Sequence, residues 1–165
     1  NFALEAKNCG LKFFEQPIPS KDLDFMNTIT TKSSIPICSD EGVHSKKDIN
    51  DIINNRTSNG VSLKTIKLGG MVDVMNCAIF ANENNISVNL AGKVAETSIS
   101  SYAIANIATS IPQMKWDLSI TNQYLVEDPV LEPLNIKDGK VYIKETIGLG
   151  TEIDMGKAKK YIILN

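Results

Sequence analysis

Two acidic residues and one lysine follow short apolar runs of this sequence. Glu15 comes after residues 11–14, Asp40 after residues 35–38, and Lys67 after residues 63–66. Their spacing of about 26 positions leaves room for one strand, one loop and one helix per interval. The tips of successive parallel strands converge, so these three side chains are expected to lie close together. Two carboxylates can hold a hard divalent cation, and a nearby lysine can act as a general base.

The segments between these residues carry the apolar spacing of helices. Strands are predicted at residues 11–14, 35–38, 62–67, 86–90 and 115–118, and helices at 2–9, 21–31, 46–54, 72–84 and 99–109. Ser45 is a suitable N-cap for the helix over 46–54. This alternation predicts an α/β fold with about five parallel strands and outer helices. A complete (β/α) barrel needs about 250 residues, so 165 residues predict part of one, and we expect a C-terminal segment of a longer protein.

The pattern changes after Tyr124. Turn signals such as Asp138-Gly139 and Gly148-Leu149-Gly150 separate short segments with strand-like alternation. We therefore divide the chain into a partial barrel over residues 1–124 and a short β-rich tail over 125–165.

Composition excludes several classes of partner. A net charge of −2 gives no electrostatic basis for binding nucleic acid or an anionic membrane, and no apolar run approaches the roughly 18 residues of a membrane span. The three cysteines have the spacing of neither a zinc site nor a disulfide framework, so they are expected to be reduced and the protein cytoplasmic.

Three segments resemble the enolase superfamily, in its muconate-lactonizing subgroup, and within it most of all the dipeptide epimerases. They are Glu15-Gln16-Pro17, Ser39-Asp40-Glu41 and Lys67-Leu68-Gly69-Gly70, and the resemblance runs from about residue 13 to 154. It implies a Mg²⁺ cofactor with Glu15 and Asp40 as ligands, a small-molecule carboxylate substrate and a homo-oligomer in the intact protein. It also implies Lys67 as the base. Because strand neighbours face opposite ways, Glu41 is expected beside the lysine rather than on the metal, although which of the two acids ligates stays open.

The same resemblance implies that a third metal ligand and a second base come from strands before Glu15. Neither is found in this chain; Lys64 lies on the same predicted strand as Lys67 and does not replace the second base. Epimerisation requires a base on each face of the α-carbon.

The resemblance also implies a substrate-binding set. Asp117 and Ser119 stand where dipeptide epimerases have Asp-x-Asp, which binds the α-ammonium group, and Lys93 and Glu96 follow the strand over 86–90. The replacement of the second aspartate by Ser119 weakens the charge available there. Alternatively, Asp117 is a simple strand-end acid, Lys93 is a solvated loop lysine, and Glu96 is a first-turn helix acid favoured by the helix dipole.

We therefore expect Mg²⁺-dependent abstraction of a proton α to a carboxylate, with epimerisation of a dipeptide such as one of L-Ala and Glu as the outcome. A muconate cycloisomerase or an o-succinylbenzoate-synthase-type lyase is the alternative within the family. From another class, the chain alone is a catalytically incomplete fragment, since it lacks the earlier strands and a half barrel exposes sheet edges.

Overall fold

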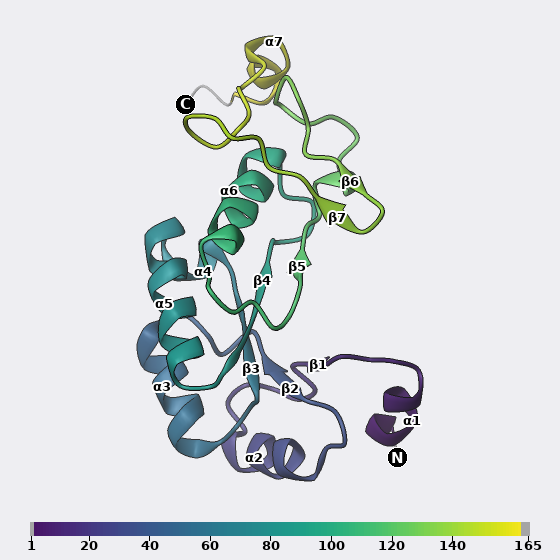
Figure 1. Cartoon of the computed structure of the whole chain (residues 1–165), viewed down its shortest axis with the longest axis vertical. Coiled ribbons are helices and arrows are strands. Elements are labelled where there is room, and N and C mark those ends of the chain that lie inside the picture. Colours follow the sequence, from purple (N-terminus) through teal and green to yellow (C-terminus); the bar gives the residue numbers. More distant parts are fainter. Residues whose placement is uncertain (1, 163–165) are drawn as a thin grey trace.

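The computed structural model describes residues 2–162 and contains one curved, five-stranded parallel sheet with helices packed on its outer side (Figure 1). The strand order is β1-β2-β3-β4-β5, so each strand pairs with the next one along the chain. In chain order, the elements up to β5 are α1 (Phe2–Asn8), β1 (Phe14–Glu15), α2 (Leu23–Lys32), β2 (Ile37–Ser39), α3 (Lys46–Asn55), β3 (Gly60–Leu63), α4 (Thr65–Leu68), α5 (Met71–Glu83), β4 (Ser87–Ala91), α6 (Ser98–Thr109) and β5 (Leu118–Ser119). Of these, α1 lies apart from the other helices and buries none of its residues (Figure 1). The expected partial barrel of five parallel strands with outer helices is confirmed.

The main core lies between the sheet and helices α3, α5 and α6. Val61 and Leu63 of β3 and Val88 and Leu90 of β4 are fully or almost fully buried there, against side chains such as Val74 of α5. Because successive strand residues alternate in direction, the intervening residues of β3 and β4 face the opposite, concave side of the sheet. Ser45 caps α3 as expected, with its Oγ accepting a hydrogen bond from the backbone N–H of Asp48.

All five predicted strands have somewhat different bounds in the structure, and two of the differences change where candidate site residues lie. The strand expected over 62–67 ends at Leu63, and Thr65–Leu68 forms one helical turn that stops at Gly69, whose φ of 96° is left-handed. Ile66 is the apolar residue that suggested a longer strand. Its side chain is 62% exposed, so it does not pack in the core as a residue of a buried strand would. The strand expected over 115–118 starts only at Leu118, because Trp116 turns to stack on Phe13, with ring centroids 4.3 Å apart.

That aromatic pair joins the two edges of the sheet. Phe13 precedes β1 and Trp116 precedes β5, so their contact draws the first and last strands toward each other across the concave side. Gly60 makes room for the indole: a Cβ at this position would lie 2.2 Å from Trp116 Cζ3. The indole of Trp116 therefore occupies space that any side chain at position 60 would need.

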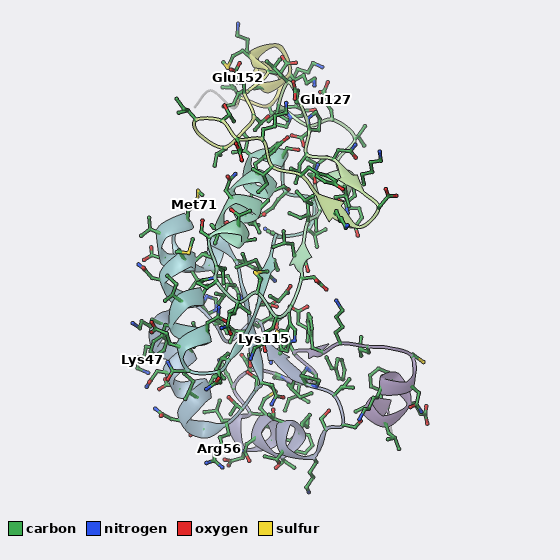
Figure 2. The ribbon with its side chains drawn as sticks, in the orientation of Figure 1. Lys47, Arg56, Met71, Lys115, Glu127 and Glu152 are labelled. Atoms are coloured by element: carbon green, nitrogen blue, oxygen red, sulfur yellow. The ribbon has the colours of Figure 1, made fainter. Side chains whose placement is uncertain are left out.

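The segment after β5 is mixed rather than only β-rich. It contains η1 (Asn122–Tyr124), the antiparallel pair β6 (Ile136–Lys137) and β7 (Lys140–Val141), α7 (Met155–Ala158) and η2 (Lys159–Tyr161). Asp138 and Gly139 form the two-residue connection with φ values of 51° and 70°, as a tight hairpin requires. Glu127 and Glu152 of this tail lie at the opposite end of the molecule from Arg56, which ends α3 (Figure 2).

Three free cysteines are present among the described residues, Cys9 exposed and Cys38 and Cys77 buried. Within residues 2–162, no helix is both long and apolar enough to cross a membrane. The division at residue 124 and the packing of the tail on a further domain stay predictions, and the end of that tail, 163–165, lies outside the described residues.

Candidate active site at the strand ends

Asp40 forms ion pairs with two lysines. It directly follows β2, and its side chain is only 10% exposed. Lys64 Nζ lies 2.5 Å from Asp40 Oδ2, and Lys67 Nζ lies 2.6 Å from Asp40 Oδ1. Two ammonium groups therefore share one carboxylate at the carboxyl ends of neighbouring strands.

The two lysines are held in different ways. Lys67 Nζ also lies 2.5 Å from the backbone oxygen of Asp40 and 3.2 Å from that of Ser62, so three acceptors account for all three of its N–H donors. Lys64 Nζ has Asp40 as its hydrogen-bond acceptor and keeps two donors uncommitted within residues 2–162. Lys64 also continues β3 in extended conformation, on the same side as Gly60 and Ser62, which faces the concave surface. Lys64 was not predicted as a site residue, although its even spacing from Gly60 places it on the inward side of β3.

Glu15 is the last residue of β1 and an exposed one. Its Oε1 accepts a hydrogen bond of 2.5 Å from Ser62 Oγ of β3. Gln16 then ties β1 to β2: its backbone N–H donates to the Cys38 carbonyl, and its Oε1 accepts from the backbone N–H of Asp40 at 2.9 Å. Gln16 adopts a left-handed φ of 38°, so the loop holds a strained backbone next to both acids. The structure thus places Glu15 and Asp40 on neighbouring strand ends.

Burial and charge act in opposite directions on the pKa of Asp40. Burial alone would raise it, but the hydrogen bonds and charges of Lys64 and Lys67 outweigh burial and lower the pKa of this carboxyl. Burial raises the pKa of the neighbouring Cys38 thiol to about 12. Cys38 is therefore a packed thiol at neutral pH and no candidate nucleophile.

The predicted substrate-binding residues lie farther along the sheet. Asp117 precedes β5, is exposed, and forms an ion pair of 2.5 Å with Lys12 from the segment before β1. Ser119 is an exposed residue of β5 whose carbonyl accepts from the Gly92 N–H. No hydrogen bond or ion pair within residues 2–162 joins Asp117 or Ser119 to the Asp40 cluster.

The loop after β4 packs beside that same edge. Thr121 Oγ1 donates to the Lys93 carbonyl and contacts the Glu96 N–H, while Glu96 Oε2 accepts from Ser100 Oγ at 2.7 Å. The Lys93 side chain is exposed. Glu96 is half-buried and precedes Thr97, the N-cap of α6, so the alternative that Glu96 is a first-turn helix acid is wrong. Glu41 is exposed, and its carbonyl contacts the His44 ring.

The donor set suits a hard cation only in part. Glu15 and Asp40 supply carboxylate oxygens from adjacent strands, the ligand type that Mg²⁺ prefers. Within the described residues, no group of three His, Cys, Asp or Glu side chains could hold a metal ion. These two acids therefore fit as part of a ligand set and not as a whole one.

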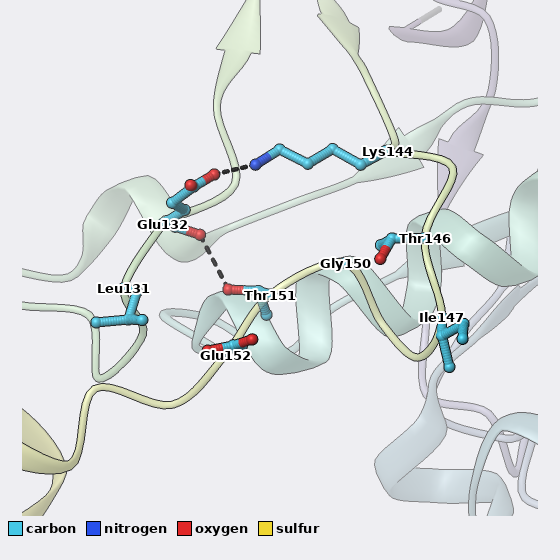
Figure 3. Close-up of a pocket in the computed structure, with 8 residues that line it drawn as sticks. All are labelled: Leu131, Glu132, Lys144, Thr146, Ile147, Gly150, Thr151 and Glu152. Atoms are coloured by element: carbon cyan, nitrogen blue, oxygen red, sulfur yellow. Dashed lines mark hydrogen bonds and ion pairs between the residues drawn. The ribbon is translucent and has the colours of Figure 1, made fainter.

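A hollow of about 320 Å³ in the tail lies elsewhere and contains none of the predicted site residues. It is formed by the loops around Glu132 and Thr151 (Figure 3). Lys144 forms an ion pair with Glu132, and Thr151 Oγ1 donates to the Glu132 carbonyl, so these contacts close the loops on each other. The hollow brings together no acid–base pair beyond this exposed ion pair.

Comparison with known proteins decides the family. Residues 1–157 match the family model described as "Enolase C-terminal domain-like". This chain belongs to the enolase superfamily. Its matched part is the C-terminal domain of the mandelate racemase and muconate lactonizing enzyme type.

Among the curated relatives of this enolase-superfamily chain, a chloromuconate cycloisomerase from Cupriavidus pinatubonensis is 29% identical over 153 residues, 92% of this chain and 41% of that protein. An o-succinylbenzoate synthase from Listeria innocua is 26% identical over 95% of this chain and 42% of its own length. The chain therefore spans about two fifths of the curated relatives it matches.

Among solved structures, the muconate lactonizing enzyme from Pseudomonas putida superimposes with a TM-score of 0.89 at 24% identity, covering 96% of this chain and 44% of that one. At this identity the match shows the fold alone. The superfamily and its muconate-lactonizing side are thus confirmed, and the narrower resemblance to dipeptide epimerases is not specifically supported.

Proposed function

We propose that this chain provides one side of the active site of a Mg²⁺-dependent enzyme that transfers a proton at a carbon α to a carboxylate, in the cycloisomerase or lyase manner. One observation carries the proposal: Asp40, between two lysines, lies beside Glu15 at the carboxyl ends of adjacent parallel strands. In parallel β/α folds this is the side on which catalytic residues gather.

The chemistry gives each residue a role. A proton α to a carboxylate is very weakly acidic, so negative charge that builds up on the carboxylate must be stabilised. A Mg²⁺ ion bound by Glu15 and Asp40, with further ligands from outside residues 2–162, would supply that stabilisation. The lysine on the concave side of β3 exchanges the proton with the α-carbon.

We assign this base to Lys64 in preference to the Lys67 of the sequence prediction. Lys64 has the inward position on the strand and, within residues 2–162, a single hydrogen-bond partner, so its Nζ can turn toward a substrate. Lys67 Nζ is instead held by three carbonyl and carboxylate oxygens. In this assignment Lys67 holds Asp40 and the end of β3 in place. Glu41, the expected neighbour of the lysine, forms no hydrogen bond or ion pair with either lysine through its side chain within the described residues.

The substrate class follows from the contacts of Asp117. Its carboxylate is already paired with Lys12, and Ser119 offers a hydroxyl where a second acid would be needed for an ammonium group. Substrates of the proteins named cycloisomerase and o-succinylbenzoate synthase are therefore favoured over dipeptides. We propose a carboxylate of the muconate kind.

Dipeptide epimerisation is the second candidate, and Asp117 is the observation that favours it. The Asp117 side chain is 72% exposed, and an exposed ion pair contributes at most about 1 kcal/mol, so a substrate ammonium group could displace Lys12. In that case Ser119, Lys93 and Glu96 would line the same edge of the sheet.

The proposal includes a larger assembly. Within the described residues β1 and β5 each have one neighbouring strand, so we propose that further strands and a capping domain complete the barrel, in a homo-oligomeric cytoplasmic enzyme. An isolated 165-residue polypeptide is then expected to be inactive and self-associating, because its sheet edges and apolar tail residues are exposed.

The test is a turnover assay of the full-length protein. Muconate consumption is followed by absorbance with Mg²⁺, with EDTA, and after Mg²⁺ is restored. We expect turnover that EDTA abolishes and Mg²⁺ recovers. Equal turnover with and without EDTA would exclude the metal role, and turnover of L-Ala-Glu dipeptides alone would favour the second candidate.

A further inference from the structure

Glu15 ends a hydrogen-bond chain that crosses the concave side of the sheet. Asn89 Nδ2 of β4 donates to Ser62 Oγ of β3 at 2.9 Å, and Ser62 Oγ donates to Glu15 Oε1 of β1 at 2.5 Å. Ser62 is fully buried and Asn89 is 2% exposed. The chain thus links an exposed acid at the sheet edge to two buried polar residues in the middle strands.

The donor and acceptor roles in this series of hydrogen bonds are determined by Asn89 at one end and Glu15 at the other. The amide nitrogen of Asn89 can only donate, so Ser62 Oγ must accept from it. Ser62 has a single hydroxyl hydrogen, and the carboxylate of Glu15 is an acceptor, so that hydrogen points to Glu15. The Cys38 thiol, 3.4 Å from Ser62 Oγ, is then left to donate to it. No rotation of the hydroxyl satisfies these partners better.

The two carboxylate oxygens of Glu15 differ in their hydrogen bonding. Oε1 receives the Ser62 hydrogen bond, while Oε2 has no hydrogen bond or ion pair from any residue between 2 and 162. An exposed glutamate has several rotatable bonds, and a fixed partner on one oxygen restricts them.

We infer that Ser62 and Asn89 are positioning residues for metal binding: they hold Glu15 so that Oε2 is presented to the cation. This inference rests on the proposed function, because it needs Glu15 to be a ligand. Hydrogen-bond partners behind metal ligands typically change metal affinity by about 10- to 100-fold when they are removed.

The experiment compares Ser62→Ala with Ser58→Ala in the full-length protein. Ser58 is a matched control because it is also buried and its Oγ also makes a 2.9 Å hydrogen bond, to the Gly60 carbonyl, without contacting Glu15. Mg²⁺ affinity is measured by isothermal titration calorimetry, and folding by thermal unfolding without metal.

We expect at least tenfold weaker Mg²⁺ binding in Ser62→Ala and an unchanged affinity in Ser58→Ala, with similar losses of thermal stability. Unchanged affinity in Ser62→Ala would overturn the inference. If Ser62→Ala does not fold, Asn89→Ala decides in its place, with weaker binding again expected and unchanged affinity overturning the inference. A wild-type protein that binds no Mg²⁺ would instead overturn the proposed metal site, and this inference with it.

Discussion

Lys64 Nζ and Asp40 Oδ2 lie 2.5 Å apart, although the two residues are 24 positions apart in the chain. The contact joins the end of β3 to the end of β2, and in the part of the chain that the structure describes it is the single hydrogen bond of Lys64 Nζ. An acid and a lysine from separate strands therefore lie in direct contact at the proposed active site.

Replacing Lys64 is expected to be more damaging to catalysis than replacing Lys67. Lys64→Met should reduce α-proton exchange by about 10³-fold, the range for loss of a general base. Lys67→Met removes contacts to the Asp40 and Ser62 carbonyls, so it should reduce thermal stability more than exchange. Exchange by NMR and thermal unfolding separate the two effects. A greater loss of exchange in Lys67→Met would restore Lys67 as the base.

The stability of the protein should fall in acid through Asp40. Its pKa is lowered in the folded state, so its stabilising contribution is present above the unfolded value near pH 4 and is lost as pH falls through the folded pKa. Asp40→Asn should cost about 3 kcal/mol at pH 7, because two ammonium groups lose their counter-charge. It should also flatten the acid side of the stability profile. Urea unfolding without metal between pH 3 and 7 measures both, and an acid slope equal to that of the wild type would contradict this role.

The comparison of Asp117→Ala with Lys12→Ala distinguishes the two candidate substrates. Because the pair is exposed, each change should alter the free energy of unfolding by less than about 1 kcal/mol. For a cycloisomerase substrate without an ammonium group, both variants should keep nearly wild-type kcat/KM. If dipeptides are the substrates, Asp117→Ala should lose at least tenfold while Lys12→Ala does not, and that outcome would contradict our preference.

The close approach of Trp116 to Gly60 predicts that this glycine cannot be replaced without loss of stability. Gly60→Ala should destabilise the protein by about 3 kcal/mol, because the added Cβ would lie 2.2 Å and 2.3 Å from Trp116 ring atoms and 2.7 Å from the Ser87 carbonyl. Trp116→Phe removes the ring atoms in conflict and should recover part of the loss in the double variant. Chemical denaturation of the four proteins gives the coupling. If the losses of unfolding free energy in the two single variants simply add in the double variant, the methyl group conflicts with the strand backbone and not with the indole.

The sequence predicted the order and type of the elements well because apolar periodicity and turn residues are local signals. Strands and helices alternate as expected, and Ser45 and Asp138-Gly139 act as cap and turn. Glu15 and Asp40 could be placed at strand ends for the same reason.

What could not be predicted depends on contacts between distant segments. The sequence predicts Lys67 as the base and excludes Lys64 as a second base, because both lie on one predicted strand. The helical turn of α4, which separates the two lysines, depends on Gly69 in the left-handed conformation. In the sequence, Ser62 and Asn89 are ordinary polar residues of two predicted strands. Their role depends on hydrogen bonds that form only when β1, β3 and β4 lie side by side in the folded sheet. The stacking of Trp116 on Phe13 likewise joins residues from the two edges of the sheet.

The most direct test of the central claim is incorporation of solvent deuterium. The full-length protein, with Mg²⁺ and muconate in D₂O, is followed by NMR and mass spectrometry, with Lys64→Met as the comparison. We predict one deuterium at the carbon next to a carboxylate of the product, formed with Mg²⁺ and Lys64 and lost without either. Product formed without deuterium at that carbon, or equal labelling in Lys64→Met, would contradict proton transfer by this site.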